Sequence, residues 1–238
     1  MGLANYCIRR ARVAFEATGI FLLFLLTICG QSPLRAQTAP TKTELQTRIP
    51  GFLGRGLIAR QPYEPITARQ RLLWTFHSTM GRESLVAGVF SAGIGTAEND
   101  PAEFGPSWPG FGKRYGIRLG GIATQNVLEA SLGSIWGEDP RYERLPGSPF
   151  RARVWNVIKL TFIARYRDGG YGPALARLGG ISGSNILSDG WRARSETDGV
   201  DTAFRVLLGL LGRMSSNAFV EFWPNVRKHI GLRAEQPP

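Results

Sequence analysis

The chain has 238 residues, a net charge of +11 at neutral pH, 30 glycines and only 2 cysteines. Its hydrophobic content of 43% and its charged content of 20% exclude wholesale disorder, and the lack of a Gly-X-Y period excludes collagen. The length is sufficient for a hydrophobic core. Composition therefore indicates a folded, basic, glycine-rich protein, but it does not indicate which reaction or ligand the protein serves.

The first 36 residues have the layout of a secretory signal peptide. Three arginines lie among the first twelve residues, residues 20–29 are apolar but too short to span a bilayer comfortably, and Ala36 is a small residue suited to cleavage. We therefore expect an exported protein of the periplasm or cell envelope. The alternatives are an uncleaved N-terminal membrane anchor and a lipoprotein attached at Cys29.

Cleavage after Ala36 would change the chemistry of the mature chain. Both cysteines would leave, which excludes disulfides, thiolate nucleophiles and cysteine-ligated zinc. Four arginines and one glutamate would also leave, so the net charge would fall from +11 to +8. Outside the cytoplasm a basic protein meets anionic lipid or anionic envelope polymers. We expect such partners and no nucleic acid.

The pattern of the next residues predicts a leader followed by two helices. Residues 37–64 are polar and rich in proline and glycine, as in a flexible leader. Helical spacing of apolar residues predicts a helix over 65–80, with Thr67 as a capping residue. The apolar and small residues 84–97 predict a second helix, with a buried strand as the alternative. Breakers in 98–112 predict a loop.

A long helix is predicted over residues 113–136, and glycines mark one side of its beginning. Gly112, Gly116 and Gly120 recur every four residues, a spacing that allows two helix backbones to approach closely. Each glycine in a helix costs up to about 1 kcal/mol relative to alanine. We therefore expect close packing against another helix to offset this cost.

The second half of the chain predicts further helices separated by loops. Residues 137–149 form a loop, 150–167 form the most hydrophobic helix, and a helix that begins at Pro173 continues to residue 187. A polar loop at 188–199 precedes a long helix over 200–222.

The end of the chain is expected to be a short helix and a tail. Pro224 should break the preceding helix, residues 225–232 predict a short basic helix, and 233–238 a disordered tail. Residues 65–232 then form a single all-α domain of five or six helices, closely packed through glycine and other small residues. The alternative is an outer-membrane β-barrel, which the glycine, the aromatic residues and export would fit.

The residues needed for common catalytic and metal sites are scarce. The two histidines, His77 and His229, are far apart and lack an acidic residue at metal-ligand spacing. No Gly-x-Ser-x-Gly elbow of a serine hydrolase is present. We therefore expect no catalytic set, no metal and no cofactor, and the balance is against an enzyme.

One loop nevertheless gathers charged residues into a candidate site. It contains Glu138, Asp139, Arg141 and Tyr142, and its alternating charges predict local ion pairs. The alternative is an envelope hydrolase that uses loop carboxylates such as those of Glu138, Asp139 and Asp168, because two carboxylates suffice for glycoside hydrolysis.

A second candidate site lies near the C-terminus. Trp223, Arg227, Lys228 and Arg233 combine an aromatic ring with cations, as in helices that lie at a bilayer interface. Each basic group near an anionic surface contributes roughly 1 kcal/mol. These residues would contact a membrane surface or an anionic polymer. The alternative is a terminal helix that docks Trp223 on the core.

Four short motifs occur together: WPGFGKRYG at 108–116, EDPRY at 138–142, RYRDG at 165–169 and EFWP at 221–224. Together they resemble an uncharacterised group of exported bacterial proteins, of acidobacterial type, to which no function is assigned. The resemblance covers roughly residues 65–231. It implies export and one domain, and it brings no catalytic residues.

Two functional hypotheses follow from the sequence. The first is a non-enzymatic envelope protein that associates with a membrane or an anionic envelope polymer through arginines. The second is the envelope hydrolase with loop carboxylates. The sequence indicates no substrate and no oligomeric state.

Overall fold

The structure, a computed structural model, describes residues 63–229. The predicted signal peptide with its cleavage site at Ala36, most of the leader, Arg233 and the tail therefore lie outside the described residues. The α-helices of the described part are α2 (Ala68–Met80), α3 (Arg82–Ala97), α4 (Trp108–Trp136), α5 (Phe150–Phe162), α6 (Leu175–Ser188) and α7 (Gly199–His229). The predicted all-α class is confirmed, and residues 84–97 are helical rather than a buried strand.

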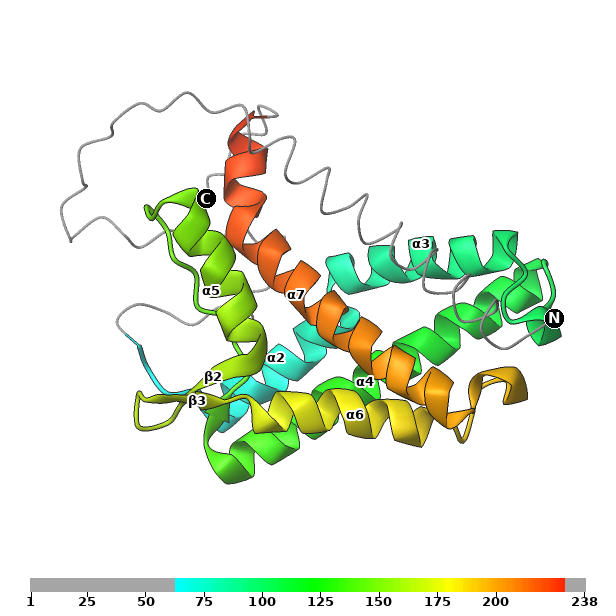
Figure 1. The fold of residues 1–238 in the computed structure, drawn as a ribbon, viewed down its shortest axis with the longest axis horizontal. Coiled ribbons are helices and arrows are strands. Elements are labelled where there is room, and N and C mark those ends of the chain that lie inside the picture. Colours follow the sequence, from blue (N-terminus) through cyan, green and yellow to red (C-terminus); the bar gives the residue numbers. More distant parts are fainter. Residues whose placement is uncertain (1–62, 230–238) are drawn as a thin grey trace.

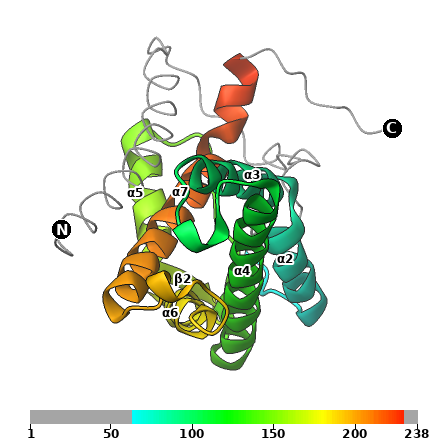
Figure 2. The same cartoon turned by 90° about the vertical axis from the view of Figure 1, so that its right-hand side faces the viewer.

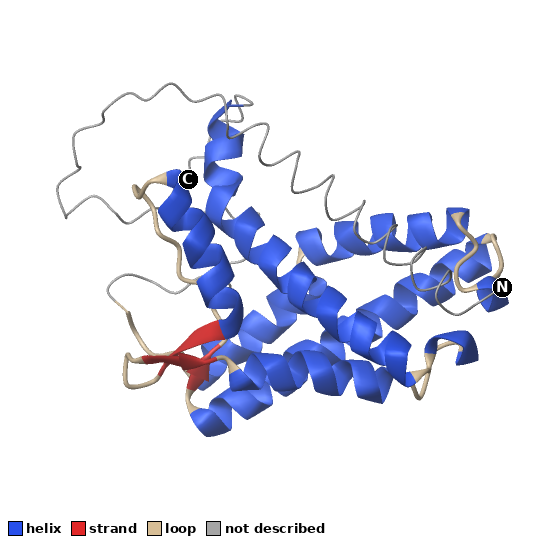
Figure 3. Ribbon diagram, in the orientation of Figure 1, coloured by secondary structure: helices blue, strands red, loops and turns tan. Residues whose placement is uncertain are grey.

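A small antiparallel sheet joins the loops at one end of the bundle. Its strands are β1 (Glu138–Asp139), β2 (Ile163–Tyr166) and β3 (Tyr171–Pro173), in the order β1-β2-β3. In the register, Glu138 lies opposite Tyr166. Figure 3 shows this sheet at the point where α5 ends and α6 begins. Short 3₁₀ helices at Ala102–Phe104 and Arg194–Glu196 lie in the predicted loops.

Helix α4 is the central element of the bundle. It packs against α2 and α3 on one side and against α6 on the other. Helix α7 crosses α6 and packs along α5, so the α5–α7 pair stands beside the α4 layer (Figures 1 and 2). The core between α5 and α7 is apolar and consists of Tyr142, Val157, Leu160, Ala218, Val220 and Phe222.

Local sequence explains where two of the helices begin. Thr67 caps α2 in a capping box, because its hydroxyl accepts from the backbone N–H of Gln70 while the Gln70 side chain accepts from the Thr67 N–H at 2.9 Å. Helix α4 begins at Trp108, five residues earlier than predicted, and Pro109 stands in its first turn. Proline is favoured there because its missing N–H has no helical partner to lose.

Two boundaries predicted in the second half of the chain are wrong. The predicted helix over 150–167 ends at Phe162, and the next residues form β2, which pairs with β3 across the turn at Gly169. Pro173, the predicted start of the following helix, is the last residue of β3.

Pro224 does not end the last helix, because α7 continues to His229. Three neighbouring side chains, Val220, Phe222 and Val226, are buried. Burying each of them contributes about 1.5–3 kcal/mol, which outweighs the roughly 3 kcal/mol cost of a proline inside a helix.

Glycines lie at the helix interfaces, but not at the predicted positions. Apart from the adjoining residues and the nearby backbone of α4 itself, no atom of the described residues lies within 4 Å of a Cβ built on Gly112, Gly116 or Gly120. The close approach predicted at these positions is therefore wrong for the described part of the chain. Close contacts occur instead at Gly133, where a Cβ would lie 2.9 Å from the Glu138 carbonyl oxygen, and at Gly180, where it would lie 3.0 Å from that of Gln125.

Candidate functional site

The interior of the bundle contains charged side chains. Those buried include Arg71, Arg114, Glu129, Glu138, Asp139, Arg153, Arg177 and Glu221. Buried charges are expensive unless they are paired or hydrogen-bonded. The contacts of each charged side chain therefore show whether it has a structural role.

Glu129 on α4 is the centre of one buried group of charges. Its Oε1 atom accepts from Nε of Arg177 on α6 at 3.1 Å and from Nη2 of Arg213 on α7 at 2.6 Å. Burial lowers the pKa of Arg213 to about 10, and the charge of Glu129 opposes that shift. One carboxylate thus joins three helices that are distant in sequence, which sequence reasoning missed because no local pattern links these residues.

Glu138, predicted as a loop acid, lies in β1 and is buried. Its carboxylate accepts from the backbone N–H of Ala176 at 2.8 Å and from that of Arg177 at 3.3 Å. These donors are at the N-terminus of α6, where the helix dipole favours a negative charge. Burial raises the pKa of Glu138, and the hydrogen bond from Ala176 opposes this.

Asp139 pairs with Arg141, an instance of the local ion pairing that the sequence predicts for this loop. The carboxylate lies 2.7 Å from Nη2 of Arg141, and both side chains are almost fully covered. The hydroxyl of Tyr63 also donates to Asp139 at 3.3 Å. Asp139 is therefore held by neighbours on two sides.

Tyr142 lies away from the other members of the predicted loop site. Its hydroxyl donates to Oε2 of Glu221 on α7 at 3.0 Å, and Nε of Arg153 lies 2.7 Å from Oε1 of the same carboxylate. Burial raises the pKa of Tyr142, and the negative charge of Glu221 adds to the shift. The residues of the predicted loop site are thus divided between two buried clusters. Glu138 and Asp139 lie in β1, whereas Tyr142 binds Glu221 of α7. No observation in the described residues favours hydrolysis at this loop.

The C-terminal candidates can be placed only in part. Trp223 is half-buried, its ring lies 4.9 Å from that of Phe219, and it packs against the α5–α7 core. Arg227 and Lys228 belong to α7, but their side chains are outside the described residues, as is Arg233.

The outer faces of α2 and α3 are apolar. Their large exposed side chains are Leu72, Leu73, Phe76, Met80, Val86, Val89, Phe90 and Ile94. The residues that α3 buries are the small Gly88 and Ala92, and residues 84–97 contain no charged residue. Helix α3 therefore exposes its large apolar side chains and buries small ones, the reverse of the usual amphipathic arrangement, whereas α2 exposes several large apolar side chains but buries Trp74.

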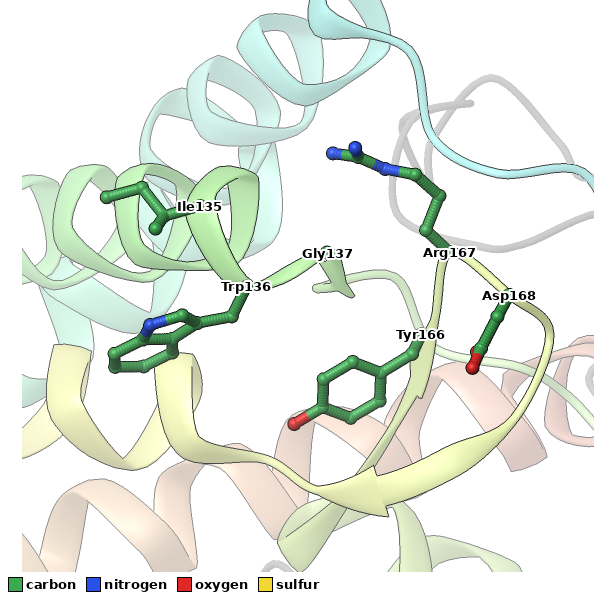
Figure 4. Close-up of a pocket in the computed structure, with 6 residues that line it drawn as sticks. All are labelled: Ile135, Trp136, Gly137, Tyr166, Arg167 and Asp168. Carbon is green, nitrogen blue, oxygen red and sulfur yellow. The ribbon is translucent and has the colours of Figure 1, made fainter.

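A hollow of about 270 Å³ lies between the end of α4 and the sheet. Its lining consists of Ile135, Trp136, Gly137, Tyr166, Arg167 and Asp168. Figure 4 shows the Tyr166 ring between Trp136 and Asp168, and the Arg167 side chain extending away from both rings, beyond Gly137. Two of the motifs singled out in the sequence, at 138–142 and 165–169, therefore meet beside this hollow.

The described residues contain neither a metal-binding cluster nor a membrane-spanning helix. No group of three or more histidine, aspartate or glutamate side chains there could hold a metal ion. None of the helices there has the length and apolar composition needed to cross a membrane.

Comparison with known proteins gave no relatives. No protein-family model matches the chain, and no curated protein and no solved structure has significant similarity to it.

Proposed function

We propose that the chain is an exported, non-enzymatic protein of the cell envelope that lies on a membrane surface through α3 and the neighbouring face of α2. The observation that carries the proposal is the exposed outer face of α3, which has no charge over residues 84–97. Soluble proteins rarely expose extended apolar patches, and those they do expose mark contact with a partner or a membrane.

A lipid surface explains the pattern better than a solvated one. Phe90 on α3 is 69% exposed and Phe76 on α2 is 63% exposed. Transfer of each ring from water to the apolar part of an interface contributes about 1.5–3 kcal/mol. A helix that lies in the plane of the interface buries one apolar face and does not need the length of a membrane span.

Aromatic residues at the start of α4 support the same contact. Trp108 is 84% exposed, its ring packs edge-on against Phe111 at 5.8 Å, and Phe111 stacks on Tyr115 at 6.2 Å. The Tyr115 ring in turn lies against Gly88 of α3. Aromatic side chains are enriched at membrane–water interfaces, where an apolar ring with a polar atom is favoured.

This contact differs from the arginine-mediated contact expected from the sequence. The basic residues expected to make that contact, Arg227, Lys228 and Arg233, have side chains outside the described residues. The contact proposed here is made by the exposed apolar side chains of α2 and α3, so it should occur on neutral lipid and resist salt, because salt screens charges and leaves apolar association in place.

Vesicle flotation tests the proposal. Protein isolated from cells that express the full chain should float with vesicles of phosphatidylcholine alone and stay bound in about 1 M NaCl, where the Debye length is about 3 Å. Phe90→Glu should reduce the bound fraction at least tenfold, because an apolar contact is lost and a charge must be desolvated. Leu207→Glu, at a residue of α7 that is 58% exposed, is the matched control and should bind normally.

Two results would contradict the proposal. Binding that requires anionic lipid and is lost in salt would return the contact to the arginines. Equal binding by Phe90→Glu and Leu207→Glu would remove α3 from it. The export part has its own test, because recovery of the full chain only from the cytoplasm after cell fractionation would show that residues 1–36 do not act as a signal.

A further inference from the structure

We propose that the hollow at the end of α4 binds one hexose ring of a glycan. The hollow, with its volume of about 270 Å³, is slightly smaller than the roughly 300–1,000 Å³ of sites for drug-sized molecules. It therefore suits a single ring, and it is open enough for the rest of a chain to extend into solvent.

The lining has the chemistry that a sugar requires. The rings of Trp136 and Tyr166 come from different elements and reach the same hollow (Figure 4). Aromatic faces carry partial negative charge and attract the C–H groups on the apolar face of a sugar ring. Trp136 is 46% exposed, so much of its ring is available for such a contact.

The polar side chains of the hollow match hydroxyl groups. Arg167 supplies N–H donors, and Asp168 supplies carboxylate acceptors. A hydroxyl both donates and accepts, so hydroxyls at different positions of one sugar match both residues. The charges of Arg167 and Asp168 also cancel, which suits a neutral ligand. Asp168 would repel an anionic ligand, and an acyl chain would have to remove water from both charged groups.

The walls of the hollow are fixed by contacts that need no ligand. The Tyr166 hydroxyl donates to the Pro173 carbonyl at 2.7 Å, and the ring lies against Gly172, where a Cβ would come within 2.9 Å of Cε2. The backbone N–H of Arg167 donates to the Gly137 carbonyl at 2.9 Å. These residues are already ordered without a ligand, so binding costs them little conformational entropy, which favours affinity.

The turn that carries the polar residues is fixed as well. Oδ1 of Asp168 accepts from the Gly170 N–H at 2.9 Å, which leaves its second oxygen for a ligand. Nη2 of Arg167 donates to the Ser134 carbonyl at 3.3 Å, and this hydrogen bond holds the guanidinium beside the last turn of α4. The guanidinium has five N–H donors, so others remain for a ligand.

Ligand-observed NMR on the full chain tests this site with water-soluble probes. Glucose, galactose, N-acetylglucosamine and the β-1,4-linked trimer of N-acetylglucosamine should be titrated separately. At least one should bind saturably, with a Kd of about 1 mM or below, as expected for a single-ring site. Trp136→Ala should weaken that binding at least tenfold. Trp191→Ala is the matched control, because Trp191 is 44% exposed and follows the opposite end of α6, and its binding should be unchanged.

A second variant and a lipid probe complete the test. Asp168→Asn keeps the hydrogen bond of the turn but removes the charge. It should weaken sugar binding several-fold and leave the circular dichroism spectrum unchanged. This variant therefore tests the site even if Trp136→Ala misfolds. Vesicles with a galactolipid headgroup, compared with the trimer, show whether a lipid or a polymer carries the ring. Lack of saturable binding to every sugar probe, or equal binding by Asp168→Asn and wild type, would overturn the site. Neither result affects flotation with sugar-free phosphatidylcholine, so the proposed membrane contact stands or fails separately.

Discussion

Nε of Arg153 on α5 lies 2.7 Å from Oε1 of Glu221 on α7, and the two side chains are 8% and 0% exposed. The guanidinium also lies 4.6 Å from the centre of the Phe222 ring. The second oxygen of Glu221 accepts from Tyr142 at 3.0 Å and from the Leu145 N–H at 3.2 Å. This pair therefore fastens the loop before α5, α5 itself and α7 to one another at a point that water does not reach.

Removing the charge of Glu221 should destabilise the protein strongly. In Glu221→Gln the Arg153 guanidinium stays buried without its counter-charge, and breaking a buried pair in this way costs about 3–5 kcal/mol. Urea unfolding followed by circular dichroism measures the loss. Glu64→Gln, at an exposed carboxylate, is the control and should unfold within about 0.5 kcal/mol of wild type. A loss below about 1 kcal/mol for Glu221→Gln would show that the pair is not holding α5 to α7.

The helices could be predicted from the sequence because their signals are local. The capping box at Thr67 and the apolar spacing that follows it are contained within α2, and the structure confirms the helix. The sheet could not be predicted in the same way. Residues 163–167 continue the apolar pattern of α5, and only pairing with β3 and β1 makes Ile163–Tyr166 a strand.

The candidate sites were harder to predict than the fold for the same reason. The sequence indicates ion pairing within the 138–144 loop because its acidic and basic residues lie close together, but the partners of Glu129 and Glu221 come from helices far along the chain. The hollow combines the end of α4 with the β2 turn, and its two halves are 30 residues apart in sequence. The glycine spacing at 112, 116 and 120 pointed to an interface that Gly133 and Gly180 form instead.

Two glycines of α4 should respond in opposite ways to alanine. A Cβ on Gly133 would lie 2.9 Å from the Glu138 carbonyl oxygen, so Gly133→Ala should lower the free energy of unfolding by about 1–3 kcal/mol. A Cβ on Gly116 would meet no atom of the described residues within 4 Å beyond the adjoining residues and the nearby backbone of α4, so Gly116→Ala should raise the free energy of unfolding by up to about 1 kcal/mol. Thermal and urea unfolding of the two variants gives the comparison. Stabilisation by Gly133→Ala would mean that β1 moves away from α4 at no cost.

Tyr171 should titrate at unusually high pH. Burial and the hydrogen bond to Glu143 raise its pKa to about 12, above the usual value of about 10. Since the folded state holds the proton more tightly, the associated stability is fully present below about pH 10 and is lost as the pH rises toward 12. In a titration of tyrosinate absorbance, Tyr171→Phe should therefore lose part of the transition near pH 12 and leave the part near pH 10 intact. Loss of amplitude near pH 10 instead would show that Tyr171 is solvated.

Arg114 should be irreplaceable by lysine at the turn between α3 and α4. Its Nε, Nη1 and Nη2 atoms each donate at 2.8 Å to a carbonyl of that turn, from Asp100, Gly105 and Pro101. The ammonium of a lysine is a point charge that does not reproduce this planar arrangement, and each lost hydrogen bond to a charged group costs about 1.5–3 kcal/mol. Arg114→Lys should therefore lower the free energy of unfolding by at least about 2 kcal/mol. It should also speed amide hydrogen exchange at residues 98–107, next to the proposed membrane-facing helix. Lys113→Arg, at the exposed neighbouring position, is the control and should change neither the stability nor the exchange. Unchanged exchange in Arg114→Lys would show that the turn keeps its shape without the guanidinium.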